Sequence, residues 1–483
     1  MASNNISKES DSRDDVENVG SKINTIVMPD DEKTQPHFVG SLIDEKEKVT
    51  KSLEETKSIA NKEIKQTINV QLKTPSKASV RLKKVTYWKK NSDASLEDEP
   101  FYHGYMAREE AERCLTKDGE FIVRKAAVKG NEGYIISVQS SSKKLHLHIQ
   151  KMRQKNLYWL HTYCFESIPD LIRYHQDMRI PVYEDVVILK SCVEREQWQL
   201  YHEQVVLGDT LGSGEFGLVY KGTLTVGLFT KPIDVAVKTL KTSILNSDQR
   251  VTFLREANVM LKLQHKNVVR LYGVATQKEP LMIVMEFAAG GTLLHKAKEG
   301  TLSLSTKRKY CIHVVCGMKY LEKQQVMHRD LAARNCLIDA TDTCKISDFG
   351  LSLLGRLHKE KNMVKVPVRW LAPETLRSGT YSNKSDVWSY GVLMFEVFSN
   401  GKVPYEHVKK LGILRNEVLG GLRLQPPSDM PSEDCAIMIM CFENDPAKRS
   451  SFADLEEAYK PSTEVSKFSK IVKWFSAEKV DFT

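Results

Sequence analysis

The chain has 483 residues, of which 41% are hydrophobic and 28% are charged, a balance typical of soluble globular proteins. This composition excludes a collagen-like or wholly disordered chain, and the length allows about three domains. The net charge of +9 is too small over this length to indicate nucleic-acid binding, so no nucleic-acid partner is expected. The nine cysteines form no Cys-x-x-Cys pair, which favours reduced thiols and a cytoplasmic protein.

The first 86 residues contain a single aromatic residue, Phe38, among many serines, lysines and acids. Such a stretch cannot bury enough apolar surface to offset its ordering entropy, so residues 1–100 are predicted to be a disordered, charged segment. Residues 61–90 carry nine basic side chains and one acidic side chain. They could contact an acidic membrane surface, although a solvated linker is the simpler interpretation. The longest apolar run, 281–289, is too short to span a membrane, so no transmembrane segment is expected.

The composition changes at Phe101, where short runs of alternating apolar and polar residues begin. The runs 120–124, 133–139 and 145–150 predict strands, and the 3.6-residue spacing in 107–115 and 168–176 predicts flanking helices. Residues 102–192 therefore form a small module with a central antiparallel sheet between two helices. A connector, 193–204, leads to a second region, 205–460, that runs from strands to helices, and 461–483 form a tail. The predicted fold class is α+β.

Three glycines in the second region, Gly212, Gly214 and Gly217, have the G-x-G-x-x-G spacing. Dinucleotide-binding folds use the same spacing but open a helix at the third glycine. Here the following residues keep strand character, so the glycines are predicted to lie in a hairpin over phosphate groups, with Val219 and Ala236 flanking a purine. The alternative is an ordinary glycine-rich hairpin.

An apolar strand ends at Lys238, where an unpaired ammonium group would be costly. Glu256 lies eighteen residues later beside the apolar stripe of a predicted amphipathic helix and is the natural counter-ion. A lysine held in this way can direct its charge to phosphates. A surface lysine on an edge strand is the alternative interpretation.

Two short motifs, HRDLAARN at 328–335 and DFG at 348–350, supply the remaining groups that phosphoryl transfer requires. Asp330 is a carboxylate that can accept a proton from a hydroxyl. Asn335 and Asp348 provide oxygen ligands suited to Mg²⁺. Each residue alone is more often a solvated loop residue, but the whole set in this order points to a phosphotransferase.

Together with A-P-E at Ala372–Glu374, these motifs resemble the protein-kinase signature over about residues 205–460. The resemblance implies a bilobal kinase fold that uses ATP with Mg²⁺ or Mn²⁺. It also implies that Asp386 braces the catalytic loop and that Arg449 pairs with Glu374. The ATP-binding residues implied by the resemblance are Leu211, Gly212, Ser213, Gly214, Glu215, Phe216, Gly217, Leu218, Val219, Ala236, Lys238, Met285, Glu286, Ala288 and Leu337.

Two segments resemble tyrosine kinases more than serine/threonine kinases. Arg334 stands in an A-A-R-N sequence near the proposed base Asp330, and Pro367 and Trp370 precede A-P-E. By resemblance these residues place a tyrosine acceptor. The segment between DFG and A-P-E contains no tyrosine, so activation is predicted not to depend on tyrosine phosphorylation there.

The smaller module resembles an SH2 domain over 102–192. Arg124 would bind a phosphotyrosine phosphate bidentately, Arg108 would add a second contact, and His146 would brace the ring. The segment 125–129 that follows Arg124 contains no hydroxyl residue. Phosphotyrosine binding is therefore predicted to be real but weaker than usual.

An SH2 domain joined to a tyrosine kinase by a Trp-containing connector resembles the Fes/Fer group of non-receptor kinases. The resemblance implies transfer of the γ-phosphate of ATP to protein tyrosines, with docking on phosphotyrosine-containing proteins. Because about 100 residues precede the SH2-like module, the long N-terminal membrane-bending region of those relatives is not expected. The alternative function is a catalytically weak phosphotyrosine-binding adaptor.

Overall fold

A computed structural model describes residues 83–84, 95–128, 131–152, 156–184, 186–213, 217–227, 230–240, 247–360 and 366–460. The predicted disordered segment 1–100 lies outside these residues except at 83–84 and 95–100, and the predicted tail 461–483 lies wholly outside them. Residues 95–100 are ordered: the 3-10 helix η1 (Leu96–Asp98) packs Leu96 against the core of the following module. Glu99 in the same stretch is buried and forms an ion pair with Arg173.

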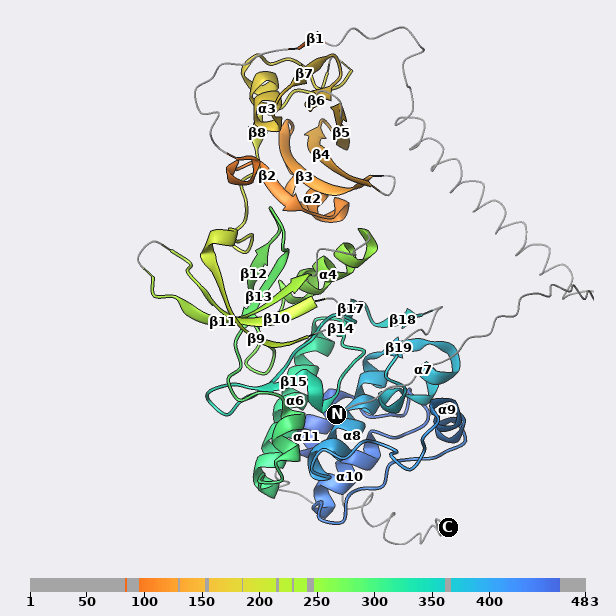
Figure 1. Ribbon diagram of the computed structural model, residues 1–483. Coiled ribbons are helices and arrows are strands. Elements are labelled where there is room, and N and C mark those ends of the chain that lie inside the picture. The colour runs from red at the N-terminus through yellow and green to blue at the C-terminus, as the bar shows by residue number, and fades with distance from the viewer. Residues whose placement is uncertain are drawn as a thin grey trace, which may run out of the picture. The chain divides into compact units, whose positions relative to one another are not determined.

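The smaller module is built on one sheet with the strand order β1-β7-β6-β5-β4-β3-β2, and β8 pairs with β3 (Figure 1). The strands are β1 (Lys83–Lys84), β2 (Tyr102–Tyr105), β3 (Glu120–Val128), β4 (Asn131–Ser140), β5 (Lys143–Met152), β6 (Leu157–Leu160), β7 (Tyr163–Phe165) and β8 (Ser191–Cys192). The helices are α2 (Arg108–Cys114) and α3 (Ile168–Asp177). The predicted order of helix, antiparallel strands and helix is confirmed.

The two helices of this module cover opposite faces of the sheet. Because successive side chains of a strand alternate between faces, β3 directs Phe121 and Val123 to one side and Ile122 to the other. Phe121 and Val123 pack in the core that contains Leu171 of α3, whereas Ile122 packs with Ala111 of α2. Arg124 follows two residues after Ile122, on the face that α2 covers.

The segment after Arg124 differs from the sequence expectation. The sequence predicted a strand over 120–124, but strand β3 continues to Val128, and its register with β4 pairs Lys125 with Tyr134 and Val128 with Asn131. Residues 125–128 therefore belong to the sheet.

The larger module begins with a five-stranded sheet of order β12-β13-β11-β10-β9. Its strands are β9 (Val205–Ser213), β10 (Gly217–Leu224), β11 (Ile233–Leu240), β12 (Leu271–Ala275) and β13 (Met282–Glu286). Helix α4 (Ser247–Met260) lies beside this sheet (Figure 1) and packs Phe253 and Ala257 against Leu240 and Ile283. The connector residues His202–Gln204 form the 3-10 helix η2.

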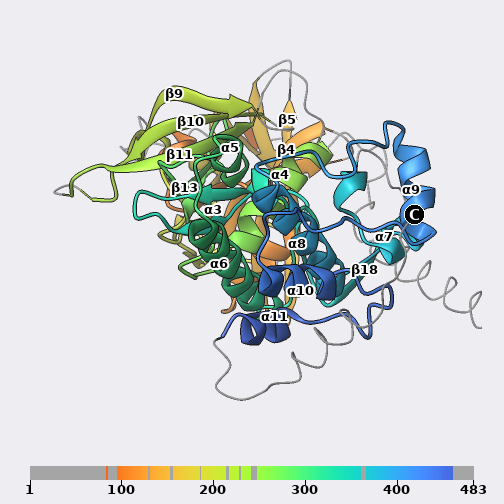
Figure 2. The same cartoon turned by 90° about the horizontal axis from the view of Figure 1, so that it is seen from below.

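Helices dominate the rest of the larger module, where α6, α8, α10 and α11 lie together in both views (Figures 1 and 2). The helices are α5 (Leu293–Lys298), α6 (Leu304–Lys323), α7 (Pro373–Ser378), α8 (Asn383–Phe398), α9 (Leu411–Leu419), α10 (Ser432–Met440) and α11 (Phe452–Ala458). Helix α8 is central because nearly all its residues are buried. None of the helices in the described parts of the chain has the length and apolar character needed to cross a membrane.

Three short strand pairs and two 3-10 turns shape the face where the candidate site lies. The short strands are β14 (Val326–Met327), β15 (Cys336–Ile338), β16 (Cys344–Ile346), β17 (Leu353–Leu354), β18 (Leu357–Lys359) and β19 (Thr380–Ser382). The pairs are β14 with β17, β15 with β16, and β18 with β19. The turns are η3 (Ala333–Asn335) and η4 (Val368–Trp370). Strands β14 and β15 flank the HRDLAARN motif and fix both of its ends.

Candidate functional site

Three charged side chains from separate elements meet at Lys238. Its ammonium group on β11 donates hydrogen bonds to both carboxylate oxygens of Glu256 on α4, at 3.0 and 2.7 Å, and lies 3.5 Å from Asp348 Oδ1. Lys238 is 7% exposed and Glu256 is 2% exposed. Burial opposes the charged lysine, but the neighbouring carboxylates of Glu256 and Asp348 outweigh it and raise the lysine pKa. The lysine is therefore charged at neutral pH.

The second group surrounds Asp330, in the loop between β14 and β15. Arg334 forms an ion pair with this carboxylate, and Asn335 Nδ2 donates to Asp330 Oδ2 at 2.8 Å and to Asp330 O at 2.7 Å. Burial raises the pKa of Asp330 to about 6, although the Arg334 charge opposes the shift. A carboxylate with this pKa is ionised at pH 7 yet basic enough to accept a proton.

The loop that carries Asp330 is fixed from beneath by Asp386 of α8. The two oxygens of this carboxylate accept hydrogen bonds from the backbone N–H groups of His328 and Arg329, each at 2.9 Å. Arg329 has a φ of +69°, a left-handed conformation that costs free energy outside glycine and needs such support. Complete burial raises the pKa of Asp386 to about 7. The expected bracing contact is present.

Arg334 also connects Asp330 to the segment before A-P-E. Its guanidinium lies 4.4 Å from the centre of the Trp370 ring, on η4. Trp370 Nε1 donates at 3.1 Å to Glu396 Oε2, and the same oxygen accepts the backbone N–H of Ala333 at 2.9 Å. Glu396 is buried in α8 and was not singled out from the sequence. The sequence feature that could have pointed to Glu396 is its place as the only acid in the apolar run VLMFEVF.

The predicted nucleotide residues lie on neighbouring strands and on the segment after β13. Ala236 of β11 pairs with Met285 of β13, and Val219 of β10 pairs with Lys238 and with Gly212 of β9. Leu337 of β15 is half-buried and bridges to Thr292. The remaining described members are Leu211, Ser213, Gly217, Leu218, Glu286 and Ala288, whereas Gly214, Glu215 and Phe216 lie outside the described residues. The sheet therefore groups Val219 and Ala236, the residues predicted to flank a purine, beside Lys238.

Steric contacts explain why the hairpin position 217 is a glycine. A Cβ atom at Gly217 would lie 1.7 Å from the carbonyl oxygen of Thr239 on β11, so this position admits only glycine. A Cβ at Gly212, by contrast, would meet no heavy atom within 4 Å.

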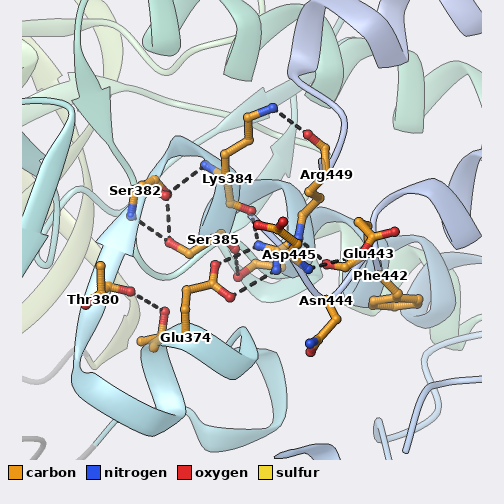
Figure 3. Close-up of polar contacts among 12 residues, drawn as sticks. Glu374, Thr380, Ser382, Lys384, Ser385, Phe442, Glu443, Asn444, Asp445 and Arg449 are labelled. Atoms are coloured by element: carbon orange, nitrogen blue, oxygen red, sulfur yellow. Dashed lines mark hydrogen bonds and ion pairs between the residues drawn. The ribbon is translucent and has the colours of Figure 1, made fainter. Parts of the chain in front are cut away.

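The segment from Asp348 to Glu374 is tied to the helical part by two ion pairs. Arg329 Nη2 lies 3.1 Å from Glu360 Oε2. Arg449, 1% exposed, donates to both oxygens of Glu374 at 2.7 and 3.0 Å, and to the carbonyls of Lys384 and Glu443 (Figure 3). Breaking such a buried pair costs about 3–5 kcal/mol, so the expected Glu374–Arg449 pair anchors this end of the segment.

The smaller module joins its three predicted residues in one hydrogen-bonded cluster with Ser137 and Glu112. Arg124, 3% exposed, donates to Ser137 Oγ and to Met106 O, both at 3.0 Å, and burial lowers its pKa to about 10. Ser137 Oγ lies 2.9 Å from His146 Nδ1. Glu112 Oε1 lies 3.0 Å from His146 Nε2 and 2.7 Å from Arg108 Nε.

Two members of this cluster, Ser137 and Glu112, were not predicted. Ser137 stands on β4 in the row opposite Ile122, so its contact with Arg124 depends on strand register. Glu112 follows Arg108 by four residues, the spacing that brings side chains together on a helix. The cluster provides a buried cation with a hydroxyl beside it, even though 125–129 contain none.

Two family models match the chain: "Protein tyrosine and serine/threonine kinase" over residues 205–459 and "SH2 domain" over 101–175. The spermatocyte protein spe-8 of Caenorhabditis elegans is 44% identical over 329 residues, which cover 68% of this chain and 64% of that protein. Human tyrosine-protein kinase Fer is 38% identical over 372 residues, covering 76% of this chain and 44% of Fer. Fer-related kinase 1 of Caenorhabditis elegans is 34% identical over 376 residues, covering 76% of this chain and 95% of that protein.

This chain belongs to the Fes/Fer-like tyrosine kinases. It spans less than two thirds of the length of spe-8 and less than half of human Fer.

The SH2 and kinase domains of this Fes/Fer-like chain share hydrogen bonds within one compact unit that begins at Arg81. Tyr105 N–H donates to Thr276 O at 3.0 Å, and Thr276 Oγ1 donates to His103 O at 3.1 Å. Arg250 of α4 donates to the Tyr105 hydroxyl at 2.8 Å and forms an ion pair with Glu132 of β4. The helix that carries Glu256 is thus held by the SH2 domain.

Proposed function

We propose that the protein is an ATP- and Mg²⁺-dependent protein-tyrosine kinase that acts on tyrosine hydroxyls of proteins and docks on phosphotyrosine through its SH2 domain. The observation that carries this proposal is the chain of contacts from Asp330 through Arg334 to Trp370. It joins a carboxylate that can accept a proton to an aromatic wall beside which a tyrosine ring fits.

On the acceptor side, Asp330 takes the proton from the tyrosine Oη as that oxygen attacks the γ-phosphorus. Arg334 keeps this carboxylate ionised and in place through their ion pair. Trp370, fixed by Glu396, forms the wall against the acceptor. Because a tyrosine hydroxyl lies farther from its backbone than a serine hydroxyl, a bulky wall suits tyrosine.

On the nucleotide side, bound ATP would supply the γ-phosphoryl group, and Mg²⁺ would neutralise the negative charge of its phosphates. The donor set fits them, since Asn335 uses its amide N–H groups on Asp330 and could offer its side-chain oxygen to a cation. Asp348 faces Lys238 through Oδ1 and could offer Oδ2. Lys238, held by Glu256, directs positive charge to the phosphates. Asn335 and Asp348 would hold the metal ion, and the described residues contain no group of three acidic, His or Cys side chains able to hold one.

The SH2 cluster supports docking on phosphotyrosine-containing proteins through Arg124, with Arg108 and His146 beside it. We place the protein in the cytoplasm, where its nine free thiols stay reduced. The basic segment 61–90, which lies outside the described residues except for 83–84, is the candidate for peripheral membrane contact.

The decisive experiment compares the purified wild type with Asp330→Asn in ATP and Mg²⁺, using a tyrosine-containing copolymer as the substrate. Mass spectrometry of the products then identifies the modified residue type. Phosphotyrosine formed by the wild type alone supports the proposal. Phosphoserine products, or no turnover by a folded wild type that still binds phosphopeptide, would contradict it in favour of a serine/threonine kinase or an adaptor.

A further inference from the structure

Tyr201 has an unusual exposure among the tyrosines. The chain contains seventeen tyrosines, and all except Tyr87 fall within the described residues. Of these, Tyr201 alone is exposed, at 43%, and the others are buried or half-buried. A tyrosine must leave its surroundings to enter a kinase site, which for a buried ring requires local unfolding. Tyr201 is therefore the most accessible described tyrosine.

The backbone around Tyr201 also suits an acceptor segment. Tyr201 lies in the connector between the SH2 and kinase domains, with extended angles of φ −78° and ψ 147°. Its N–H donates to the Gln204 side chain at 2.7 Å, not to a strand. The last backbone hydrogen bond to the kinase sheet before it runs from Leu200 N to Val274 O at 2.8 Å. Releasing Tyr201 thus leaves the sheet intact.

A second, independent observation concerns Arg195, whose guanidinium lies 4.0 Å from the centre of the Tyr201 ring. Its Nη1 donates to Glu97 O at 3.1 Å. Its Nε and Nη2 are buried and find no hydrogen-bond acceptor within the described structure. Unpaired buried donors cost free energy, so this guanidinium is poised to bind an anion placed on the neighbouring ring.

We propose that Tyr201 is a phosphorylation site and that Arg195 binds the phosphate formed on it. The inference rests on the proposed kinase function. In the transfer, the Tyr201 Oη–H bond breaks and its proton passes to Asp330 of the acting kinase. A bond forms from Oη to the γ-phosphorus of ATP, while the bond from that phosphorus to the β-γ bridging oxygen breaks and releases ADP.

The local charges favour the product. A phosphotyrosine carries close to two negative charges at neutral pH, and a planar guanidinium can donate two parallel hydrogen bonds to it. Glu203, the nearest acid along the chain, is already in an ion pair with Lys278. The phosphate thus gains a cation without facing an uncompensated carboxylate at Glu203.

The test uses the full chain with ATP and Mg²⁺, the copolymer substrate in the same reaction, and quantitative mass spectrometry of every tyrosine peptide. We expect Tyr201 occupancy to exceed that of any other described tyrosine by about tenfold or more, because the buried tyrosines require local unfolding and the half-buried ones are less accessible than Tyr201. Tyr201→Phe should remove this phosphopeptide, whereas Tyr272→Phe, at a half-buried site, should leave it unchanged.

The copolymer separates the two possible failures. If the copolymer is phosphorylated and Tyr201 is not, the inference is overturned while the kinase function stands. If neither is phosphorylated, the kinase function fails. In that case, the inactive Asp330→Asn chain is treated with an unrelated active tyrosine kinase, which tests Tyr201 as a phosphorylation site independently of the chain's own activity. If Tyr201 is not phosphorylated there, the proposed site is wrong.

The role of Arg195 has its own measurement. Once Tyr201 is phosphorylated, a tyrosine phosphatase should remove the phosphate about tenfold faster from Arg195→Gln than from the wild type, since one charged contact is lost. Arg179→Gln, at an exposed arginine elsewhere on the SH2 domain, is the matched control and should match the wild type. Equal rates in the Arg195 and Arg179 variants would overturn phosphate binding by Arg195.

Discussion

Arg329 Nη2 lies 3.1 Å from Oε2 of Glu360, which follows 31 residues later in the segment between DFG and A-P-E. Glu360 is partly buried, and although burial opposes it, the hydrogen bond and charge of Arg329 lower the pKa of its carboxylate. In related switches a phosphate on the loop pairs with an arginine and orders the segment. Here Glu360 places a permanent carboxylate beside Arg329, and the segment between DFG and A-P-E contains no tyrosine.

We therefore predict that phosphatase treatment leaves the activity of the purified kinase unchanged. Glu360→Ala should lower kcat/KM about fivefold, because a partly exposed ion pair contributes roughly 1 kcal/mol. Lys359→Ala, at the exposed neighbouring position on β18, is the control. The idea fails if phosphatase removes most of the activity and phosphorylation of the loop restores it.

The buried pair of Lys238 and Glu256 leads to a second prediction. Lys238→Met or Asp330→Asn should reduce turnover by about 10²–10⁴, because each removes a group that acts in the transfer step. Steady-state kinetics measure the loss, and circular dichroism checks the fold. Lys221→Met, at a more exposed lysine on the neighbouring strand β10, should retain activity. Near-normal turnover in either site variant would refute the mechanism.

The raised pKa of Asp330 predicts the acid limb of the pH profile. A proton acceptor works only when ionised, so kcat should fall as the pH drops through about 6 and should approach a tenfold loss per pH unit below it. Measurements between pH 5 and 8, with a parallel check of folding, test this limb. The residual activity of Asp330→Asn should lack it. If the Asp330→Asn variant showed the same fall in kcat with the same midpoint pH, the titrating group would be another residue.

Phosphotyrosine binding gives a fourth prediction. Arg124→Leu should abolish measurable binding in calorimetry with phosphopeptides, because each hydrogen bond to a charged group contributes about 1.5–3 kcal/mol. The wild type should bind, but more weakly than usual, since residues 125–129, which follow Arg124, contain no hydroxyl side chain. Arg113→Leu, on the exposed side of α2, should bind normally. Unchanged affinity in Arg124→Leu would mean that the domain recognises another ligand.

The sequence predicted best where the relevant residues are close along the chain. Asp330, Arg334 and Asn335 lie within six residues of one another, and the resemblance of their motif to tyrosine kinases implied that Arg334 lies near the Asp330 carboxylate. Lys238 and Glu256 were also paired from the sequence, because Glu256 lies beside the apolar stripe by which the predicted helix packs on the sheet.

The residues that escaped prediction depend on long-range packing. Glu396 reaches Ala333 and Trp370 only because α8 passes beneath both, 63 and 26 residues away. The length of β3 depended on pairing with β4, which residue propensity alone does not determine. Glu360 resembled any solvated loop acid until the fold placed it beside Arg329.

The shared carboxylate of Glu396 has a consequence for how this enzyme can diversify. One oxygen accepts both the backbone N–H of Ala333 and the indole N–H of Trp370, so the loop of the proposed base and the acceptor wall are fastened to the same atom. A substitution at Trp370 that widened the range of acceptors would also remove one of the two donors that fix the Glu396 carboxylate, and so would weaken the support of the loop that carries Asp330. A change in the range of acceptors is therefore expected to lower the turnover rate as well. Evolution towards new substrates would have to pass through slower enzymes or would need compensating substitutions in α8.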